Sequence, residues 1–133
     1  MKKVIIGIVI VLVVGALGLV LFGDKQTTTS KEPAAEPAYA AIQTDIDNGA
    51  LLVDVRTPEE FSAGHIEGAV NVPVEEIQDG TMPTTDKETK LYVYCRSGNR
   101  SAQAKTTLEA AGYTTVEDLG GMDEVVAMGG EQV

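Results

Sequence analysis

The sequence contains one cysteine, one histidine and no tryptophan among its 133 residues. A single cysteine cannot form a disulfide within the chain, which excludes the disulfide-rich class of small secreted domains. One cysteine and one histidine are also too few for a self-contained Cys/His zinc site. We therefore expect neither a metal site nor a cofactor.

Positive charge is scarce as well. The chain carries 10 Lys and Arg side chains against 20 Asp and Glu, which gives a formal net charge of −10. Nucleic-acid binding needs a basic surface that displaces counterions from phosphates, so this balance argues against a nucleic-acid partner. The chain is also too short for two domains once its apolar N-terminal part is set aside.

That N-terminal part is an unbroken apolar run over residues 4–22, without a charged side chain. As a helix it would span roughly 28 Å, close to the hydrocarbon thickness of a bilayer, which predicts a transmembrane signal anchor over residues 1–22. A cleaved secretory signal is the alternative. Its apolar region is usually shorter, about 7–15 residues, and the nearest small-x-small site, Ala38-Tyr39-Ala40, lies far beyond the run.

Lys2 and Lys3 precede the apolar run, so the positive-inside rule places the N-terminus in the cytoplasm. We expect a single-pass protein of the cell membrane, bound to the bilayer through residues 4–22, with its C-terminal domain outside the cytoplasm. Residues 23–37 contain no large apolar side chain and are expected to form a flexible linker.

From residue 38 onward, strand and helix signals alternate. The expected strands are Leu51–Val55, Ala69–Val72, Leu91–Tyr94 and Tyr113–Val116. Between them lie helix signals: Thr57 can cap a helix in which Glu60 closes the capping box, and Ser101–Ala111 has helical spacing and ends at Gly112. This alternation predicts one domain over 38–133, with a mostly parallel sheet and helices on both faces.

Chemistry is concentrated where the strand Leu91–Tyr94 ends. The segment that follows it reads Cys95-Arg96-Ser97-Gly98-Asn99-Arg100 and leads into a helix. Loop amides and a helix N-terminus at the carboxyl end of a parallel strand favour an anion. Together with Arg96 and Arg100 they should stabilise a thiolate at Cys95. Gly98 allows a bend with positive φ and is expected to keep the pocket open.

All three arginines of the chain are expected at this edge of the sheet, because Arg56 also follows a strand. A positive patch on an otherwise acidic domain indicates an anion site. Asp54 and Arg56 are expected to pair near the site and brace the loop. For Arg100 two interpretations are equally open. It either acts at the site, by orienting the loop or holding an oxyanion of the substrate, or it only caps its own helix or pairs with Asp54.

Other polar residues have simpler interpretations. His65 is expected to contribute to packing and turn geometry rather than to act as a base. Tyr92 and Tyr94 are expected to pack the strand. The acidic residues expected on solvated helix faces are Glu59, Glu60, Glu75 and Glu76.

Several segments resemble the signatures of rhodanese-like domains. They are Asp54–Phe61, Gly64–Pro73, Tyr94–Ala102, Gly112-Tyr113 and Leu119–Met122, within about residues 42–129. The resemblance implies a three-layer α/β domain with a five-stranded, largely parallel sheet. It also implies that Cys95 takes sulfane sulfur from a small anionic donor such as thiosulfate, or from a persulfide. The resulting Cys95 persulfide then gives the sulfur to a thiol or cyanide.

Two other functions are open. The protein could be a membrane-tethered persulfide carrier or sulfur-binding module that does not turn over. A cysteine phosphatase is disfavoured, because those enzymes use Cys-x5-Arg and only four residues separate Cys95 from Arg100 here. One departure from the family pattern, Val125 in place of a Trp, suggests that the last helix packs loosely.

Overall fold

The computed structural model describes residues 38–133. The expected anchor over residues 1–22 and the expected linker over residues 23–37 lie outside the described residues. The longest helix between residues 38 and 133 has 12 residues. No helix in that range has the length and hydrophobicity needed to cross a membrane.

The described residues form an alternating series of helices and strands. In chain order these are α2 (Ala38–Asp47), β1 (Leu51–Asp54), α3 (Pro58–Ala63), β2 (Val70–Asn71), α4 (Val74–Gln78), β3 (Leu91–Cys95), α5 (Asn99–Ala110), β4 (Val116–Gly121) and α6 (Met122–Ala127). The strands lie in the order β2-β1-β3-β4, and every neighbouring pair is parallel. The expected α/β class and parallel sheet are confirmed.

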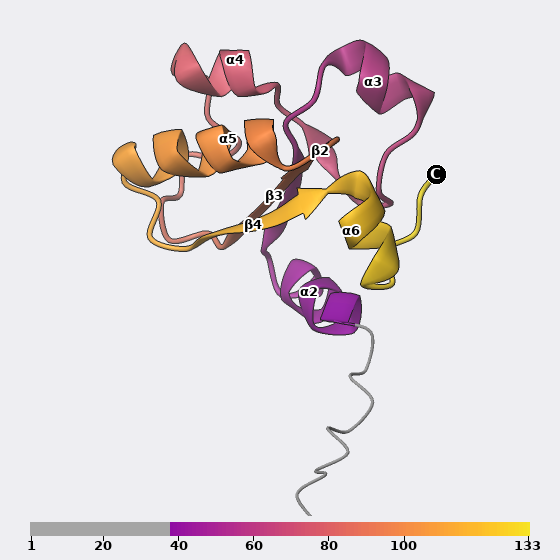
Figure 1. Ribbon diagram of the computed structural model, residues 1–133. Coiled ribbons are helices and arrows are strands. Elements are labelled where there is room, and N and C mark those ends of the chain that lie inside the picture. Colours follow the sequence, from indigo (N-terminus) through magenta and orange to yellow (C-terminus); the bar gives the residue numbers. More distant parts are fainter. Residues whose placement is uncertain (1–37) are drawn as a thin grey trace, which may run out of the picture. The chain divides into compact units, whose positions relative to one another are not determined.

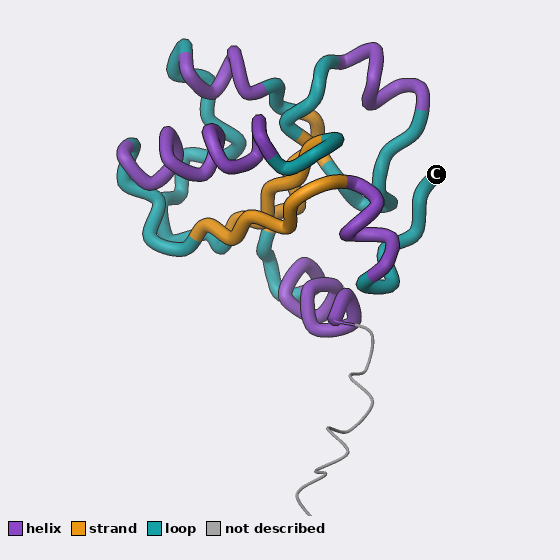
Figure 2. The backbone as a smooth tube through the Cα atoms, in the orientation of Figure 1, coloured by secondary structure: helices purple, strands orange, loops and turns teal. Residues whose placement is uncertain are grey.

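The elements form three layers. Figure 1 shows α4 and α5 on one face of the sheet and α2 and α6 on the other, and Figure 2 shows the strands between the helices. Each face has its own cluster of buried side chains. One cluster joins the sheet to Ile77 of α4 and Leu108 of α5, and the other joins it to Ile42 of α2 and Val125 of α6.

The central strand β3 is buried along its whole length, and its side chains alternate between the two clusters. Leu91, Val93 and Cys95 belong to the cluster under α4 and α5. Tyr92 and Tyr94 belong to the cluster on the opposite face, which confirms that both tyrosines pack the strand. The alternation therefore directs Cys95 toward α5.

The sheet differs from the expectation in the number and length of its strands. Four strands occur in residues 38–133 instead of five, and β4 begins at Val116, where the expected strand ended. Tyr113 is buried in the core, and the amide of Thr114 donates to the carbonyl of Lys87, outside the sheet. Pairing resumes at Thr115, whose carbonyl accepts from the amide of Leu91. Tyr113 and Thr114 thus form a packed connection and not a strand.

The C-terminal end is packed more closely than expected. Val125 is fully buried in the core. A Cβ atom at Gly130 would lie 2.9 Å from the Val125 side chain, so the chain approaches α6 closely at this point. Gln132 then forms an isolated antiparallel bridge with Ile66. The expectation of a loosely packed last helix is wrong, because Gly130 has no side chain and lets the backbone approach the buried Val125 closely.

Candidate active site

Cys95 is the last residue of β3, at the carboxyl edge of the parallel sheet. The register between β3 and β4 shifts between Val93 and Cys95, so that Cys95 faces Gly121. Such irregularities redirect a side chain where a strand ends, and they are frequent beside active sites. The next residues form a tight loop into α5, which starts at Asn99.

The sulfur of Cys95 is surrounded by hydrogen-bonding groups of this loop. The Gly98 amide nitrogen lies 2.9 Å from Sγ, and the Ser101 hydroxyl oxygen lies 3.6 Å from it. Burial raises the pKa of the Cys95 thiol, but hydrogen bonds from Ser101, Ser97 and Gly98 outweigh burial, so the net pKa is lowered. The loop therefore favours the nucleophilic thiolate.

Ser101 is fully buried, and its hydroxyl has more than one acceptor within reach. Its oxygen lies 3.0 Å from the Gly98 carbonyl and 3.6 Å from the Cys95 sulfur. A hydroxyl carries one proton and rotates freely. It can donate to the carbonyl while Cys95 is a thiol and turn toward the sulfur when Cys95 becomes a thiolate.

Gly98 has φ +91°, as expected for a glycine at this bend. A Cβ there would face the backbone of Gly120 at 3.5 Å instead of projecting into a pocket. The expectation that Gly98 keeps the pocket open is therefore wrong. Its lack of a side chain permits the left-handed conformation and the packing of the loop against the end of β4.

The loop that follows Cys95 packs closely against the end of β4. A Cβ at Gly121 would lie 2.6 Å from the carbonyl oxygen of Arg96, too close for any side chain. The Gly121 amide donates to the Glu124 carboxylate at 2.6 Å, which ties this turn to the start of α6. Gly120 and Gly121 thus form a stretch of backbone without side chains against which the loop packs, called the glycine platform below.

Asp54 and Arg56 form the expected pair. Nη2 of Arg56 lies 2.6 Å from the Asp54 carboxylate, and both side chains are buried. The Tyr94 hydroxyl also donates to Asp54, at 2.8 Å. Arg56 reaches further to the Gly64 carbonyl at 2.7 Å, so the pair joins β1 and β3 to the segment that follows α3.

Arg100 pairs with Glu60, not with Asp54. Its Nη1 and Nη2 donate to the two carboxylate oxygens of Glu60 at 2.7 and 3.0 Å. Glu60 also closes the predicted capping box with Thr57 at the start of α3. The expectation that Glu60 lies on a solvated helix face is wrong, because its carboxylate reaches from α3 to Arg100 in the first turn of α5 and is only 27% exposed.

A pocket of about 360 Å³ lies beside the loop, which contributes Arg96 to the lining, whereas the fully buried Cys95 does not line it. Its lining residues are Arg56, Glu60, Ala63, Arg96, Met122, Asp123 and Gln132. Arg56 and Arg100 are already paired, which leaves Arg96 as the arginine without an ion-pair partner in residues 38–133. The expected positive patch is thus largely neutralised, and Arg96 provides the exposed cation at the pocket.

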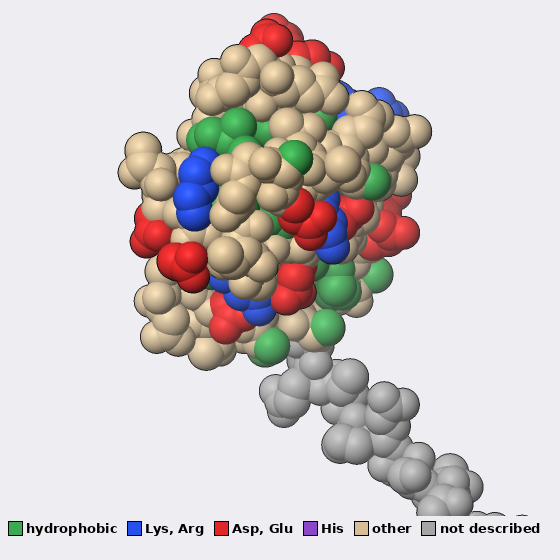
Figure 3. Space-filling model, turned by 90° about the vertical axis from the view of Figure 1, so that its left-hand side faces the viewer, with side chains coloured by type: hydrophobic (Ala, Val, Ile, Leu, Met, Phe, Trp, Pro, Cys, Tyr) green, Lys and Arg blue, Asp and Glu red, His purple; other side chains and the backbone are tan. Residues whose placement is uncertain are grey.

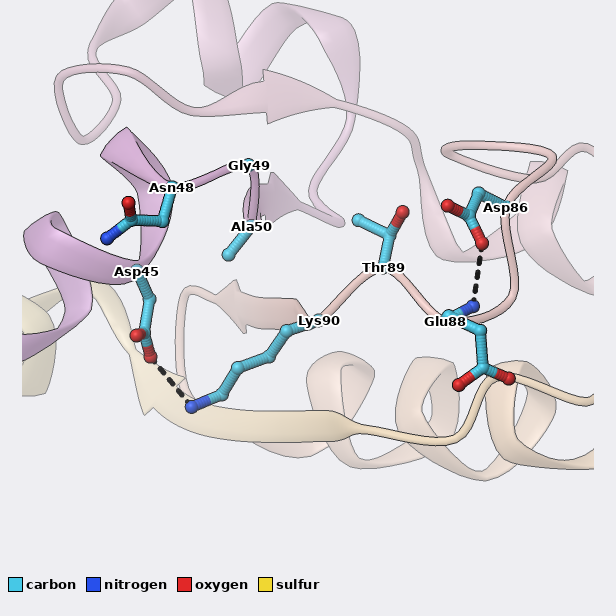
Figure 4. Close-up of a pocket in the computed structure, with 8 residues that line it drawn as sticks. All are labelled: Asp45, Asn48, Gly49, Ala50, Asp86, Glu88, Thr89 and Lys90. Carbon is cyan, nitrogen blue, oxygen red and sulfur yellow. Dashed lines mark hydrogen bonds and ion pairs between the residues drawn. The ribbon is translucent and has the colours of Figure 1, made fainter.

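A second depression, of about 490 Å³, lies at the opposite edge of the sheet. Ala50 and Lys90, which immediately precede β1 and β3, are among its lining residues, and Lys90 points to Asp45 (Figure 4). Figure 3 views the molecule from the side where β4 begins and shows acidic and basic side chains interspersed. No cysteine is among the residues that line this depression, and Cys95 lies at the other edge of the sheet.

Three parts of the site have no counterpart among the expected site residues: Ser101, Glu60 and the glycine platform. In the sequence, a serine one residue after Arg100, in the first turn of the helix, indicates that a hydroxyl lies beside Cys95. His65 stacks on Phe61 with ring centroids 3.9 Å apart, which agrees with a packing role. No group of three or more potential metal ligands occurs in the described part of the chain.

Comparison with known proteins gives a consistent result. Residues 38–128 match the family model described as a rhodanese-like domain. Thiosulfate sulfurtransferase PspE of Escherichia coli is 39% identical over 74 residues, which cover 55% of this chain and 71% of that protein. The thiosulfate:glutathione sulfurtransferase of Saccharomyces cerevisiae is 31% identical over 100 residues, covering 65% of this chain and 72% of that one.

Solved structures agree with the sequence relatives. A structure described as rhodanese with anions from E. coli aligns with a TM-score of 0.57 and 35% identity, over 63% of this chain and 96% of that chain. The human single-domain sulfurtransferase TSTD1 aligns with a TM-score of 0.55 and 29% identity, over 62% of this chain and 85% of that chain.

Proposed function

The chain belongs to the rhodanese-like family, and from this premise we propose that it is a sulfurtransferase in which Cys95 carries the sulfur as a persulfide. Its relatives named thiosulfate sulfurtransferases support sulfur transfer in general terms. The observation that carries the specific proposal is the Cys95 sulfur, held 2.9 Å from the Gly98 amide with a lowered pKa.

In the first half-reaction, the Cys95 thiolate attacks the outer sulfur of thiosulfate. A bond forms between Sγ and that sulfur, and the sulfur–sulfur bond of thiosulfate breaks. Sulfite leaves with the bonding electron pair, and the charge of the new persulfide resides on its terminal sulfur. Backbone amides aimed at Sγ favour the attacking thiolate of Cys95, so no other group has to be deprotonated for the attack.

In the second half-reaction, an acceptor thiolate or cyanide attacks the terminal sulfur of the persulfide. The acceptor leaves as a persulfide or as thiocyanate, and Cys95 is released as a thiolate. The two half-reactions share one site, so ping-pong kinetics are expected. A small anionic donor is supported by Arg96 at the pocket, where it has no ion-pair partner within residues 38–133.

The test is transfer of sulfur from thiosulfate to cyanide by the purified protein, with Cys95→Ser as the control. We expect thiocyanate formation that depends on Cys95. A mass increase of one sulfur atom on Cys95 after thiosulfate alone would identify the intermediate. Absence of Cys95-dependent transfer from thiosulfate, persulfides and polysulfides would falsify the proposal. A stable adduct without turnover would identify a sulfur carrier instead.

We also propose that residues 4–22 anchor the protein in the cell membrane, with the catalytic domain outside the cytoplasm. The support is the uncharged apolar run and the two lysines before it. Retention in the membrane fraction after alkaline extraction, and digestion of the domain by protease added outside intact cells, are the expected results. Release of a shortened domain into the medium or periplasm would indicate cleavage.

A further inference from the structure

Glu60 and Arg100 form the one charged link between α3 and the helix that follows Cys95 in the described part of the chain. The link is bidentate: Nη1 of Arg100 donates to Oε2 of Glu60 at 2.7 Å, and Nη2 donates to Oε1 at 3.0 Å. Bidentate arginine–carboxylate pairs have a defined geometry as well as attraction. The contact therefore fixes where the Arg100 charge is placed relative to the loop.

The carboxylate of Glu60 is itself held in place. It accepts a hydrogen bond from the Thr57 amide at 3.1 Å, and the Thr57 hydroxyl accepts from the Glu60 amide at 3.3 Å. Hydrogen bonds from Arg100, despite partial burial, lower the pKa of Glu60 to about 2. Glu60 is consequently charged at any pH at which a thiol is titrated.

Arg100 is the second residue of α5 and lies two residues after Gly98, whose amide nitrogen is 2.9 Å from the Cys95 sulfur. The pKa of Arg100 is raised, chiefly by its hydrogen bonds with Glu60, and the negative charge of Cys95 adds to the effect. Without Glu60, that guanidinium would act on the thiolate and on an incoming anion as a full positive charge. With Glu60 in place, most of its charge is cancelled.

We infer that Glu60 is a positioning residue that holds Arg100 against α3 and cancels its charge. It thereby weakens the pull of Arg100 on Cys95 and on an anionic donor. Glu60 lines the pocket together with Arg96, so its own charge also opposes an anion there. Arg100 accordingly orients the loop instead of holding the donor's oxyanion. The part of this inference that concerns the donor rests on the proposed sulfur transfer, whereas the part that concerns the thiolate does not.

Glu60→Gln is the sharpest variant, because a capping box accepts Gln in place of Glu and the amide has nearly the same shape. The substitution removes the charge and replaces one of the two oxygens that accept from Arg100 with a donor, so the bidentate pair is lost while the cap can remain. Glu59→Gln is the matched control: it makes the same charge change one residue earlier in α3, on an exposed side chain. Arg100→Gln makes the opposite change and leaves Glu60 without its partner.

The first readout is the rate of Cys95 alkylation by iodoacetamide in the full-length protein as a function of pH. The ionisable groups around the loop are Arg96 of the loop, Arg100 of α5, Glu60 of α3, Glu75 of α4, Asp54 at the end of β1, Arg56 just after β1, and Asp123 and Glu124 of α6. Glu60→Gln should move the alkylation midpoint to lower pH, and Arg100→Gln should move it to higher pH. Glu59→Gln should leave it in place.

The second readout is steady-state sulfur transfer. Glu60→Gln should lower the KM for thiosulfate about two- to threefold, as expected for one partly exposed charge pair, and the difference should shrink at high salt. In the double variant that combines Glu60→Gln with Arg100→Gln, the KM for thiosulfate should no longer be lower than that of the unaltered protein. A residue that only stabilises the fold would raise the KM or leave it unchanged.

An unchanged or higher alkylation midpoint in Glu60→Gln, or an equal shift in Glu59→Gln, would overturn the inference. Loss of folding in Glu60→Gln, seen as lost thermal cooperativity, would also overturn it, because the pair would then be needed for stability. If the midpoints shift as expected but no variant and no wild-type protein transfers sulfur, the electrostatic role stands and the proposed function fails.

Discussion

Replacing Asp54 with Asn removes one charge from a fully buried carboxylate. Asp54 accepts hydrogen bonds from the backbone and guanidinium of Arg56, at 2.6–3.0 Å, and from the Tyr94 hydroxyl at 2.8 Å. The amide of Asn has nearly the same shape, but one of its ends is a donor. Arg56, only 7% exposed, would then be a buried cation without a counter-charge.

Breaking a buried pair by removing one partner costs about 3–5 kcal/mol of unfolding free energy. A domain of this size has a total stability of about 5–15 kcal/mol, so the substitution removes a large share of it. Each kcal/mol lowers the melting temperature of a domain of up to 100 residues by about 4–8 °C. We therefore expect a melting point at least about 10 °C lower than that of the unaltered protein.

Urea unfolding followed by circular dichroism measures this cost, and the chain offers its own comparison. Asp45 pairs with Lys90 at 2.8 Å, but its side chain is 40% exposed. Asp45→Asn should cost much less than Asp54→Asn, because water and salt screen an exposed pair. Equal losses in the two variants would refute the reasoning that burial determines the cost.

Two further substitutions test the environment of the sulfur. Ser101→Ala removes a hydrogen bond that lowers the pKa of the Cys95 thiol, so the midpoint of pH-dependent alkylation should move to higher pH; an unmoved midpoint would mean that the amides suffice. Gly121→Ala places a methyl group 2.6 Å from the Arg96 carbonyl although φ of −86° suits alanine. Crowding alone should lower the free energy of unfolding by about 1–3 kcal/mol and should slow the alkylation of Cys95. Gly112→Ala, with no atom within 4 Å of the new Cβ, is the control and should leave the alkylation rate unchanged.

Local sequence patterns predicted the parts of the fold that depend on near neighbours. The apolar run before Cys95 indicated a buried strand, and the strand is buried along its length. Thr57 and Glu60 predicted a capping box that is present. These features depend on residues within one turn or one strand, so the sequence contains all the information needed.

Contacts between distant residues were harder to predict. Glu60 and Arg100 are 40 residues apart, and nothing in the sequence distinguishes Glu60 from the other acidic residues as the partner. β4 starts later than its sequence pattern predicts, because Tyr113 has a side chain typical of strands but packs into the core from a connecting turn. In both cases the tertiary arrangement, and not local propensity, determined the outcome.

The pairing of the arginines changes how the site attracts anions. Arg56 and Arg100 form ion pairs with Asp54 and Glu60. The arginines at this edge of the sheet therefore contribute little unpaired positive charge in the folded domain. Stabilisation of the Cys95 anion depends instead on dipoles, from the loop amides and the Ser101 hydroxyl. Dipoles fixed by the backbone act over a short range and need no counter-ion. A strongly acidic domain can therefore stabilise a thiolate at one point while its surface remains negative.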